Sequence, residues 1–304
     1  MPRPVFIAVI LGLCVALPAL AQTKPPSQVT SMTQPGQSGH ASVNGLNMYY
    51  EVYGEGPPIV LLHGGITTIE SSFAEVIPVL AKTRTVIAVE QQAHGRTADI
   101  DRPLTFEQEA DDTAAVLRKL NVRQTDVLGY SDGGNVGLGL AIRHPDLVRK
   151  LVVVGTNADN GGLQPGILDF MKVAADQDPA EAAKNMPPEM REAYVKIAPR
   201  PQDWPILISK VMKQAVALNG WTPEQLKGVK APVLVMIGDA DIIRAEHAVE
   251  LFRLFGGGAS GDMGPMPSSR LAVIPGANHM SFMTSAEVWL PMVTNFLDAP
   301  VPAK

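Results

Sequence analysis

A serine between two glycines is the feature of this sequence that points most directly to chemistry. Ser131 lies in Gly129-Tyr130-Ser131-Asp132-Gly133, after a strand-like segment and before a helix-like one. A nucleophilic serine must sit on a sharp turn with its hydroxyl exposed, and flanking glycines avoid collisions there. The alternative is a close-packed or phosphate-binding turn, but the longer glycine spacing of phosphate-binding loops is absent. We therefore predict that Ser131 is a catalytic nucleophile.

A serine hydroxyl attacks at neutral pH only when a base takes its proton, and an imidazole suits that task. His279 follows a strand-like segment and a turn at Gly276, a setting that favours a base over an ordinary structural histidine. A carboxylate is then needed to bind the other imidazole nitrogen and fix the tautomer. Asp239 and Asp241 both follow the strand-like segment 233–237, so the residues alone leave two candidates.

Four segments in chain order resemble the α/β-hydrolase superfamily, and the resemblance extends over residues 41–298. They are Leu61-Leu62-His63-Gly64-Gly65 (oxyanion loop), the glycine-flanked Ser131, Gly238-Asp239-Ala240-Asp241 (acid turn) and Pro275-Gly276-Ala277-Asn278-His279 (histidine loop). Serine, then acid, then histidine is the order that this fold uses. The resemblance implies that Asp241 is the acid, with Asp239 as runner-up. It also implies an oxyanion hole made by the backbone N–H groups of Gly65 and Asp132.

Two further residues qualify what the resemblance implies. Asp132 stands where the family more often has an apolar residue, and a carboxylate turned into the pocket would repel anionic substrates. His94 matches a family loop whose histidine is usually structural rather than catalytic. His247 and Glu250 are spaced for one helix face, but no third ligand accompanies them, so we expect no metal site.

Short apolar segments alternate with amphipathic ones, which predicts a mostly parallel sheet with helices on both faces, the α/β class. The strand-like segments are 43–53, 59–62, 85–89, 125–129, 150–154, 233–237 and 271–274. The helix-like segments are 72–81, 106–120 (with Thr105 as N-cap), 134–143, 246–255 and 286–296. Residues 157–227 lack a strand pattern, which predicts a helical cap inserted into a core of residues 41–156 and 228–304.

The chain has 304 residues and a formal net charge of −5, with no basic run that would suit nucleic acid. Arg3, the apolar residues 5–17 and Ala19-Leu20-Ala21 predict a signal peptide over residues 1–21. A retained membrane anchor and lipoprotein processing at Cys14 are the alternatives. Residues 22–40 are predicted to be a disordered linker. We therefore expect a periplasmic or secreted protein. Signal cleavage would remove Cys14, so the mature chain would have no cysteine and no stable membrane insertion.

These observations predict a serine hydrolase that cleaves carboxylic esters or lactones of small molecules through an acyl-enzyme on Ser131, without a cofactor. The alternatives with similar residues are a cofactor-free perhydrolase of the haloperoxidase type and a carbon–carbon bond hydrolase. A ligand-binding receptor on the same fold is the alternative outside enzymes, because a fold alone does not determine a function.

Overall fold

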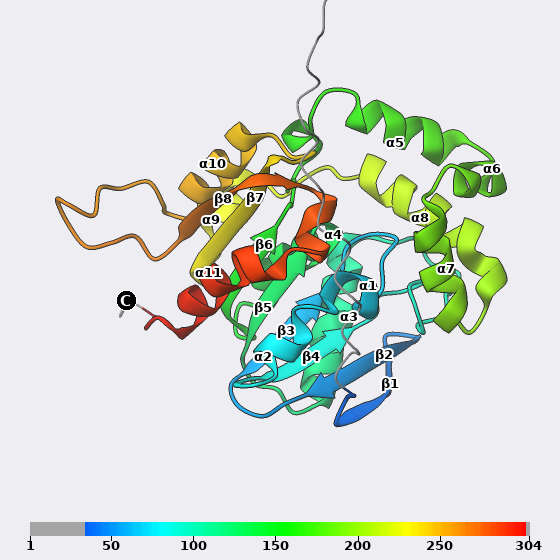
Figure 1. Cartoon of the computed structure of the whole chain (residues 1–304), viewed down its shortest axis with the longest axis horizontal. Helices are drawn as coiled ribbons and strands as arrows, with labels where there is room; N and C mark the ends of the chain where they lie inside the picture. The colour runs from blue at the N-terminus through cyan, green and yellow to red at the C-terminus, as the bar shows by residue number, and fades with distance from the viewer. Residues whose placement is uncertain (1–33, 302–304) are drawn as a thin grey trace, which may run out of the picture. The chain divides into compact units, whose positions relative to one another are not determined.

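The computed structural model of this protein describes residues 34–301 (Figure 1). The predicted signal peptide and residues 22–33 of the predicted linker lie outside these described residues. No helix within 34–301 combines the length and the apolar character needed to cross a bilayer.

One eight-stranded sheet, in the order β1-β2-β4-β3-β5-β6-β7-β8, forms the centre of the described chain. Its strands are β1 (Gln37–Val43), β2 (Leu46–Tyr53), β3 (Pro58–Leu62), β4 (Thr85–Val89), β5 (Thr125–Tyr130), β6 (Val148–Val154), β7 (Val233–Ala240) and β8 (Arg270–Asn278). Strands β3 to β8 pair in parallel, and β2 runs antiparallel to β1 and β4. The predicted mostly parallel sheet is confirmed, and parallel pairing brings the carboxyl ends of its strands to one edge.

The amino-terminal hairpin corrects two of the sequence predictions. A single strand over 43–53 is wrong, because the chain turns at Asn44-Gly45, where φ is +46° and +79°. Asn-Gly is the preferred pair for a two-residue hairpin turn. Residues 37–40, which we predicted to be linker, form the first half of β1 and pair with residues 49–52 of β2. Alternate residues of β1, Ala41 and Val43, are buried, so this strand belongs to the core.

Helices cover both faces of the sheet, as the alternating pattern predicts. They are α1 (Ile69–Phe73), α2 (Ile77–Leu80), α3 (Phe106–Lys119), α4 (Asp132–Arg143), α10 (Ala245–Leu254) and α11 (Ala286–Asp298). Helices α3, α4 and α10 pack on one face, and α1, α2 and α11 pack on the other. The single helix predicted over 72–81 is instead two short helices. Thr105 caps α3 as predicted, since its side chain accepts a hydrogen bond from the Gln108 N–H at 3.2 Å.

Only helices and irregular segments lie between β6 and β7 (Figure 1). They are the 3-10 turn η1 (Asn160–Gly162), α5 (Ile167–Asp176), α6 (Pro179–Lys184), α7 (Pro188–Ile197), the 3-10 turn η2 (Pro201–Asp203), α8 (Trp204–Val216) and α9 (Pro223–Lys227). Helices α5 to α8 share a small apolar cluster, which also includes Ala93 and Leu104 of the core, and we call these helices the cap. Helix α9 buries Leu226 in the core cluster instead, so the cap ends before the predicted residue 227.

Two side chains of α8 make polar contacts with the core. The Lys210 ammonium lies 2.7 Å from the Asp99 carboxylate, and the Gln214 amide donates to Glu109 of α3 at 2.6 Å. Since α8 also packs on the loop that follows β3, the cap is fixed over the carboxyl edge of the sheet.

Candidate active site

Ser131 lies on a strained turn between the end of β5 and the start of α4. Its φ of +54° and ψ of −121° are unusual for a residue other than glycine. The turn is held because Ser131 N–H donates to Val154 O, and Gly134 N–H donates to Ser131 O, each at 2.8 Å. A Cβ at position 129 would stand 2.2 Å from Gly133 O, and one at position 133 would stand 2.0 Å from Leu62 O. Both glycines are therefore required for steric reasons, and the turn presents the serine hydroxyl at the edge of the sheet.

A continuous hydrogen-bonded chain joins Ser131, His279 and Asp241. His279 Nε2 lies 3.0 Å from Ser131 Oγ, and His279 Nδ1 lies 2.8 Å from Asp241 Oδ1. Because a carboxylate only accepts, Nδ1 carries the proton and Nε2 faces the serine as an acceptor. The Asp241 side chain is fully buried, and its Oδ1 also accepts from the Ile243 N–H at 3.1 Å.

Asp239, the other candidate acid, faces a different partner. Its exposed side chain accepts a hydrogen bond from the Gly276 N–H at 2.9 Å, so it joins the end of β7 to the histidine loop. Of the two carboxylates, only that of Asp241 contacts the imidazole.

The structure also brings the two predicted oxyanion residues, Gly65 and Asp132, together. A Cβ at position 64 would stand 3.3 Å from Ser131 Cβ, so the loop after β3 lies directly against the nucleophile. A Cβ at position 65 would stand 2.2 Å from Asp132 Oδ2 and 3.0 Å from Val211 of α8. A side chain at 65 would therefore have to displace the Asp132 carboxylate, which lies over Gly65.

The Asp132 side chain lines the same pocket as Ser131 and His279. Desolvation raises the pKa of its carboxyl to about 6, and the nearby His279 opposes that shift. The side chain therefore turns toward the site instead of into solvent. At neutral pH it adds a negative charge to the pocket wall.

The cap leaves little free space over the nucleophile. The enclosed cavity that Ser131, Asp132 and His279 line has a volume of about 30 Å³. Most of its other walls are apolar, with Leu163, Met171 and Leu218 contributed by the segment between β6 and β7. Such a cavity holds roughly one or two water molecules. A substrate must therefore displace some of these wall side chains.

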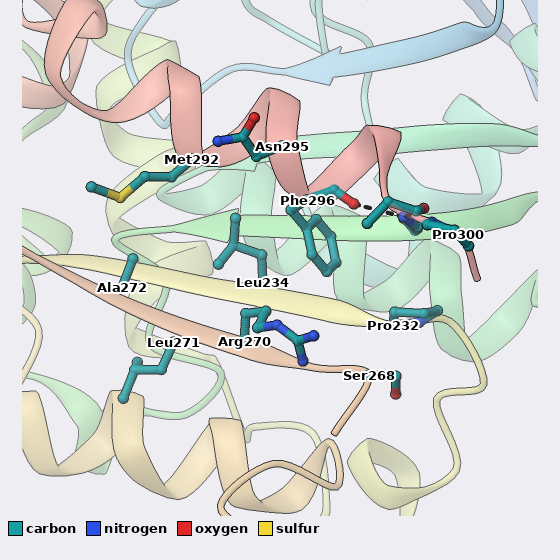
Figure 2. Close-up of a pocket in the computed structure, with 12 residues that line it drawn as sticks. Pro232, Leu234, Ser268, Arg270, Leu271, Ala272, Met292, Asn295, Phe296 and Pro300 are labelled. Atoms are coloured by element: carbon teal, nitrogen blue, oxygen red, sulfur yellow. Dashed lines mark hydrogen bonds between the residues drawn. The ribbon is translucent and has the colours of Figure 1, made fainter. Parts of the chain in front are cut away.

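A larger cavity, of about 350 Å³, lies away from these residues (Figure 2). It is bounded by β7, β8 and α11, and its lining includes Lys150, Arg270 and Phe296. Lys150 and Arg270 lie near the amino ends of β6 and β8, at the edge of the sheet opposite Ser131. The Lys150 ammonium is occupied by backbone carbonyls at the end of α11, including Phe296 O at 2.6 Å. Ser131 and His279 thus line the smaller of these two cavities.

Sequence reasoning missed two residues that shape the site. The Tyr130 hydroxyl donates to His279 O at 3.0 Å, and the two rings lie 5.3 Å apart. Gly155, with φ of +60°, lies where a Cβ would stand 3.0 Å from the His279 ring. Tyr130 lies inside the serine motif, which could have pointed to it. Nothing in the sequence around Gly155 indicates its role, because the ring it contacts, that of His279, is more than 120 residues away in the chain.

His247 is buried on α10 and hydrogen-bonds to Asn157 O at 3.0 Å. Glu250 lies 3.9 Å from its ring. Within residues 34–301, no group of three or more His, Cys, Asp or Glu side chains is arranged to hold a metal ion.

Comparison with known proteins gives this geometry a context. A model of the alpha/beta hydrolase family matches residues 59–290. Serine hydrolase BPHL of Mus musculus is 29% identical over 270 residues, covering 86% of each chain. The 2-(acetamidomethylene)succinate hydrolase of Mesorhizobium japonicum is 26% identical, covering 81% of this chain and 90% of its own. The crystal structure of the enol-lactonase from Burkholderia xenovorans LB400 has a TM-score of 0.66 at 21% identity, covering 86% of this chain and 100% of the lactonase.

Proposed function

The chain belongs to the alpha/beta hydrolase family, and on that premise we propose that it hydrolyses small carboxylic esters or lactones through an acyl-enzyme on Ser131. The observation that carries this proposal is the continuous chain from Asp241 through His279 to Ser131 Oγ, with contacts of 2.8 and 3.0 Å. Two similar sequences are named serine hydrolase BPHL and 2-(acetamidomethylene)succinate hydrolase, and the similar solved structure is an enol-lactonase.

The geometry supports acyl transfer in two steps, acylation of Ser131 and hydrolysis of the acyl-enzyme. Ser131 Oγ attacks the substrate carbonyl while His279 Nε2 takes the hydroxyl proton, and Asp241 stabilises the imidazolium that forms. The N–H groups of Gly65 and Asp132 bind the oxyanion of the tetrahedral intermediate. His279 then returns the proton to the leaving alkoxide oxygen, which departs as the alcohol. A water molecule, deprotonated by the same nitrogen, attacks the acyl-enzyme and releases the carboxylic acid.

Charge and space in the pocket indicate which acyl groups fit. The ionised Asp132 lies beside the reacting atoms, and like charges repel strongly where solvent screening is weak. Neutral acyl groups are therefore favoured over anionic ones. The enclosed volume of about 30 Å³ favours short acyl chains, because each added methylene must displace cap side chains. We expect acetyl to hexanoyl esters to be better substrates than long-chain lipids.

A fluorophosphonate probe tests the nucleophile, and p-nitrophenyl esters with a panel of small lactones test the reaction. The purified protein is expected to take up one label per chain and to turn over acetyl and butyryl esters. Ser131→Ala should abolish both, whereas Ser268→Ala, a matched change at an exposed serine far from the site, should keep both. Full labelling of Ser131→Ala would refute the assignment.

The probe and the ester and lactone panel, together with a peracid assay and a β-diketone substrate, separate the rival functions. A receptor on this fold would accept the label or bind ligands without appreciable turnover of any ester or lactone. A perhydrolase would convert a carboxylic acid and hydrogen peroxide to the peracid faster than it hydrolyses esters. A carbon–carbon bond hydrolase would leave the ester panel nearly untouched while cleaving β-diketones. The intact hydrogen-bonded chain at Ser131 favours an enzyme over a receptor, because ligand binding alone does not require it.

A further inference from the structure

The loop after β3 holds its backbone in a conformation that a side chain such as isoleucine rarely adopts. Ile66, directly after the oxyanion residue Gly65, has φ of +64°. A β-branched residue is strained in this left-handed region, and such strain persists only where the surroundings hold it. Whatever holds Ile66 therefore also helps to aim the neighbouring Gly65 N–H.

The imidazole of His94 is one of the groups that hold it. Ile66 N–H donates to His94 Nε2 at 3.2 Å, and His94 Nδ1 lies 2.9 Å from Gln92 O. Since a carbonyl oxygen only accepts, Nδ1 carries the proton and Nε2 is left as the acceptor. The ring is 3% exposed, and burial lowers its pKa to about 3, so it remains neutral.

A second neutral imidazole holds the other end of the same turn. His63 Nδ1 donates to Gly64 O at 2.8 Å, and His63 Nε2 accepts from Gln91 N–H at 3.1 Å. The rings of His63 and His94 lie 4.8 Å apart. Together they join residues 63–66 to residues 91–94, and Gly65 lies between the two attachment points.

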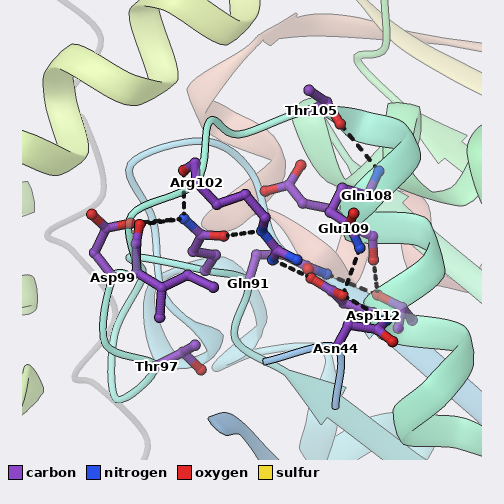
Figure 3. Close-up of polar contacts among 12 residues, drawn as sticks. Asn44, Gln91, Thr97, Asp99, Arg102, Thr105, Gln108, Glu109 and Asp112 are labelled. Atoms are coloured by element: carbon purple, nitrogen blue, oxygen red, sulfur yellow. Dashed lines mark hydrogen bonds and ion pairs between the residues drawn. The ribbon is translucent and has the colours of Figure 1, made fainter. Parts of the chain in front are cut away.

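The segment that carries His94 is itself firmly anchored (Figure 3). His94 N–H donates to Gln91 O at 3.0 Å. Arg102 donates to the Gln92 side chain at 2.8 Å and to Asp112 of α3 at 2.5 Å. Figure 3 shows the Arg102 side chain extending from this loop toward Asp112 of the helix. The acceptor for Ile66 is thus tied to the core rather than to a free loop.

We propose that His94 is a positioning residue of the oxyanion hole. Its neutral ring holds Ile66 N–H, and through it the left-handed turn that directs Gly65 N–H at the oxyanion formed on the substrate carbonyl. His94 is absent from the lining of the cavity at Ser131, so it acts through the loop. This inference rests on the proposed ester or lactone hydrolysis.

An oxyanion donor binds the transition state more strongly than the ground state, so its misplacement lowers kcat and leaves KM nearly unchanged. Loss of a whole donor typically costs about 10²–10³-fold in kcat, which is the upper limit for losing its support. A purely structural role would instead lower thermal stability without this selective loss.

Three variants test the proposal with p-nitrophenyl butyrate. His94→Phe keeps a ring of similar size without the acceptor and is expected to lose about 10- to 10³-fold in kcat, with KM within about threefold. His94→Gln can place an amide oxygen near Ile66 N–H and should recover much of that loss. His94→Ala leaves a cavity, and added imidazole should restore part of its kcat. Leu290→Ala, at a buried position of α11 far from His94 in sequence, is the control for general destabilisation and should keep kcat.

A trifluoromethyl ketone provides the second readout, because its adduct with a serine places an oxyanion in the hole. Its inhibition constant should weaken in parallel with kcat across the His94 variants. Wild-type kcat and inhibition in His94→Phe, or a loss confined to KM, would overturn the proposal while leaving ester hydrolysis intact. A wild-type protein that turns over no ester or lactone would instead overturn the proposed function. If His94→Phe does not fold, the result for His94→Gln and imidazole rescue of His94→Ala decide the question.

Discussion

Replacing Asp241 by asparagine removes one charge from the proposed catalytic chain while keeping its shape. In the native protein, Asp241 Oδ1 accepts from both His279 Nδ1 at 2.8 Å and Ile243 N–H at 3.1 Å. Its Oδ2 faces Gly238 N–H at the longer distance of 3.4 Å. An asparagine oxygen in the Oδ1 position keeps both short contacts, whereas the flipped amide would point its NH₂ at two donors. We therefore expect the histidine tautomer to survive and the loss to be electrostatic.

The size of the loss follows from the charge on the imidazolium. Two opposite charges with centres about 4 Å apart attract by about 4 kcal/mol at an effective dielectric constant of 20. Since about 1.4 kcal/mol corresponds to a tenfold change in rate, Asp241→Asn should lower kcat about 10³-fold. If the amide flips and reverses the tautomer, the loss rises toward about 10⁴-fold.

Steady-state kinetics with p-nitrophenyl butyrate measure this loss, and a thermal unfolding scan verifies that the variant is folded. Asp239→Asn is the matched control, because an asparagine oxygen can still accept from Gly276 N–H. It should keep kcat within about threefold, in line with a surface substitution. If Asp241→Asn lowers kcat by less than tenfold, the electrostatic role of Asp241 is refuted. A kcat loss in Asp239→Asn that exceeds the loss in Asp241→Asn would refute it as well.

Three further predictions concern the pocket and the chain terminus. Met171→Ala removes about three heavy atoms from the pocket wall, so kcat/KM for longer acyl esters should rise by roughly fourfold per newly buried methylene; Met190→Ala, in the cap cluster but outside that wall, should leave the acyl-chain profile unchanged. Because the pKa of Asp132 is raised to about 6, its charge is lost as pH falls through 6, and kcat/KM for a sulfonated acyl ester relative to a neutral one should rise; a similar rise in Asp132→Asn would contradict this account. N-terminal mass analysis of protein from the envelope fraction should find Gln22 first, whereas lipid on Cys14 or an intact Met1 would not fit a cleaved signal peptide.

Several features could be predicted from the sequence because their causes are local. At Ser131, a Cβ at position 129 would meet Gly133 O, so this steric requirement for glycine is contained in five consecutive residues, whereas the requirement at 133 comes from Leu62 O of a neighbouring strand. The parallel sheet follows from short apolar segments that alternate with amphipathic ones, and the cap follows from the break in that alternation. The Asn44-Gly45 hairpin also had a local signal, which the apolar run of residues 43–53 concealed.

The choice between Asp239 and Asp241 could not be made from the residues alone. Both follow the same strand, and which one meets the imidazole depends on how the loop after β8 folds against the end of β7. The structure directs Asp239 to Gly276 N–H and Asp241 to His279 Nδ1. The contact between Ile66 and His94 likewise joins residues 28 positions apart on two different loops.

The sequence by itself determined the order of the chemical groups and the elements that present them, because these depend on neighbours along the chain. The tertiary structure decided which donor faces which acceptor, how far Asp132 reaches over Gly65, and how little space the cap leaves above Ser131. Those distances arise only when the ends of β3, β5, β7 and β8 meet at one edge of the sheet. Short-range hydrogen bonds and charge interactions depend on separations of a few tenths of an ångström, which no pattern of residues specifies.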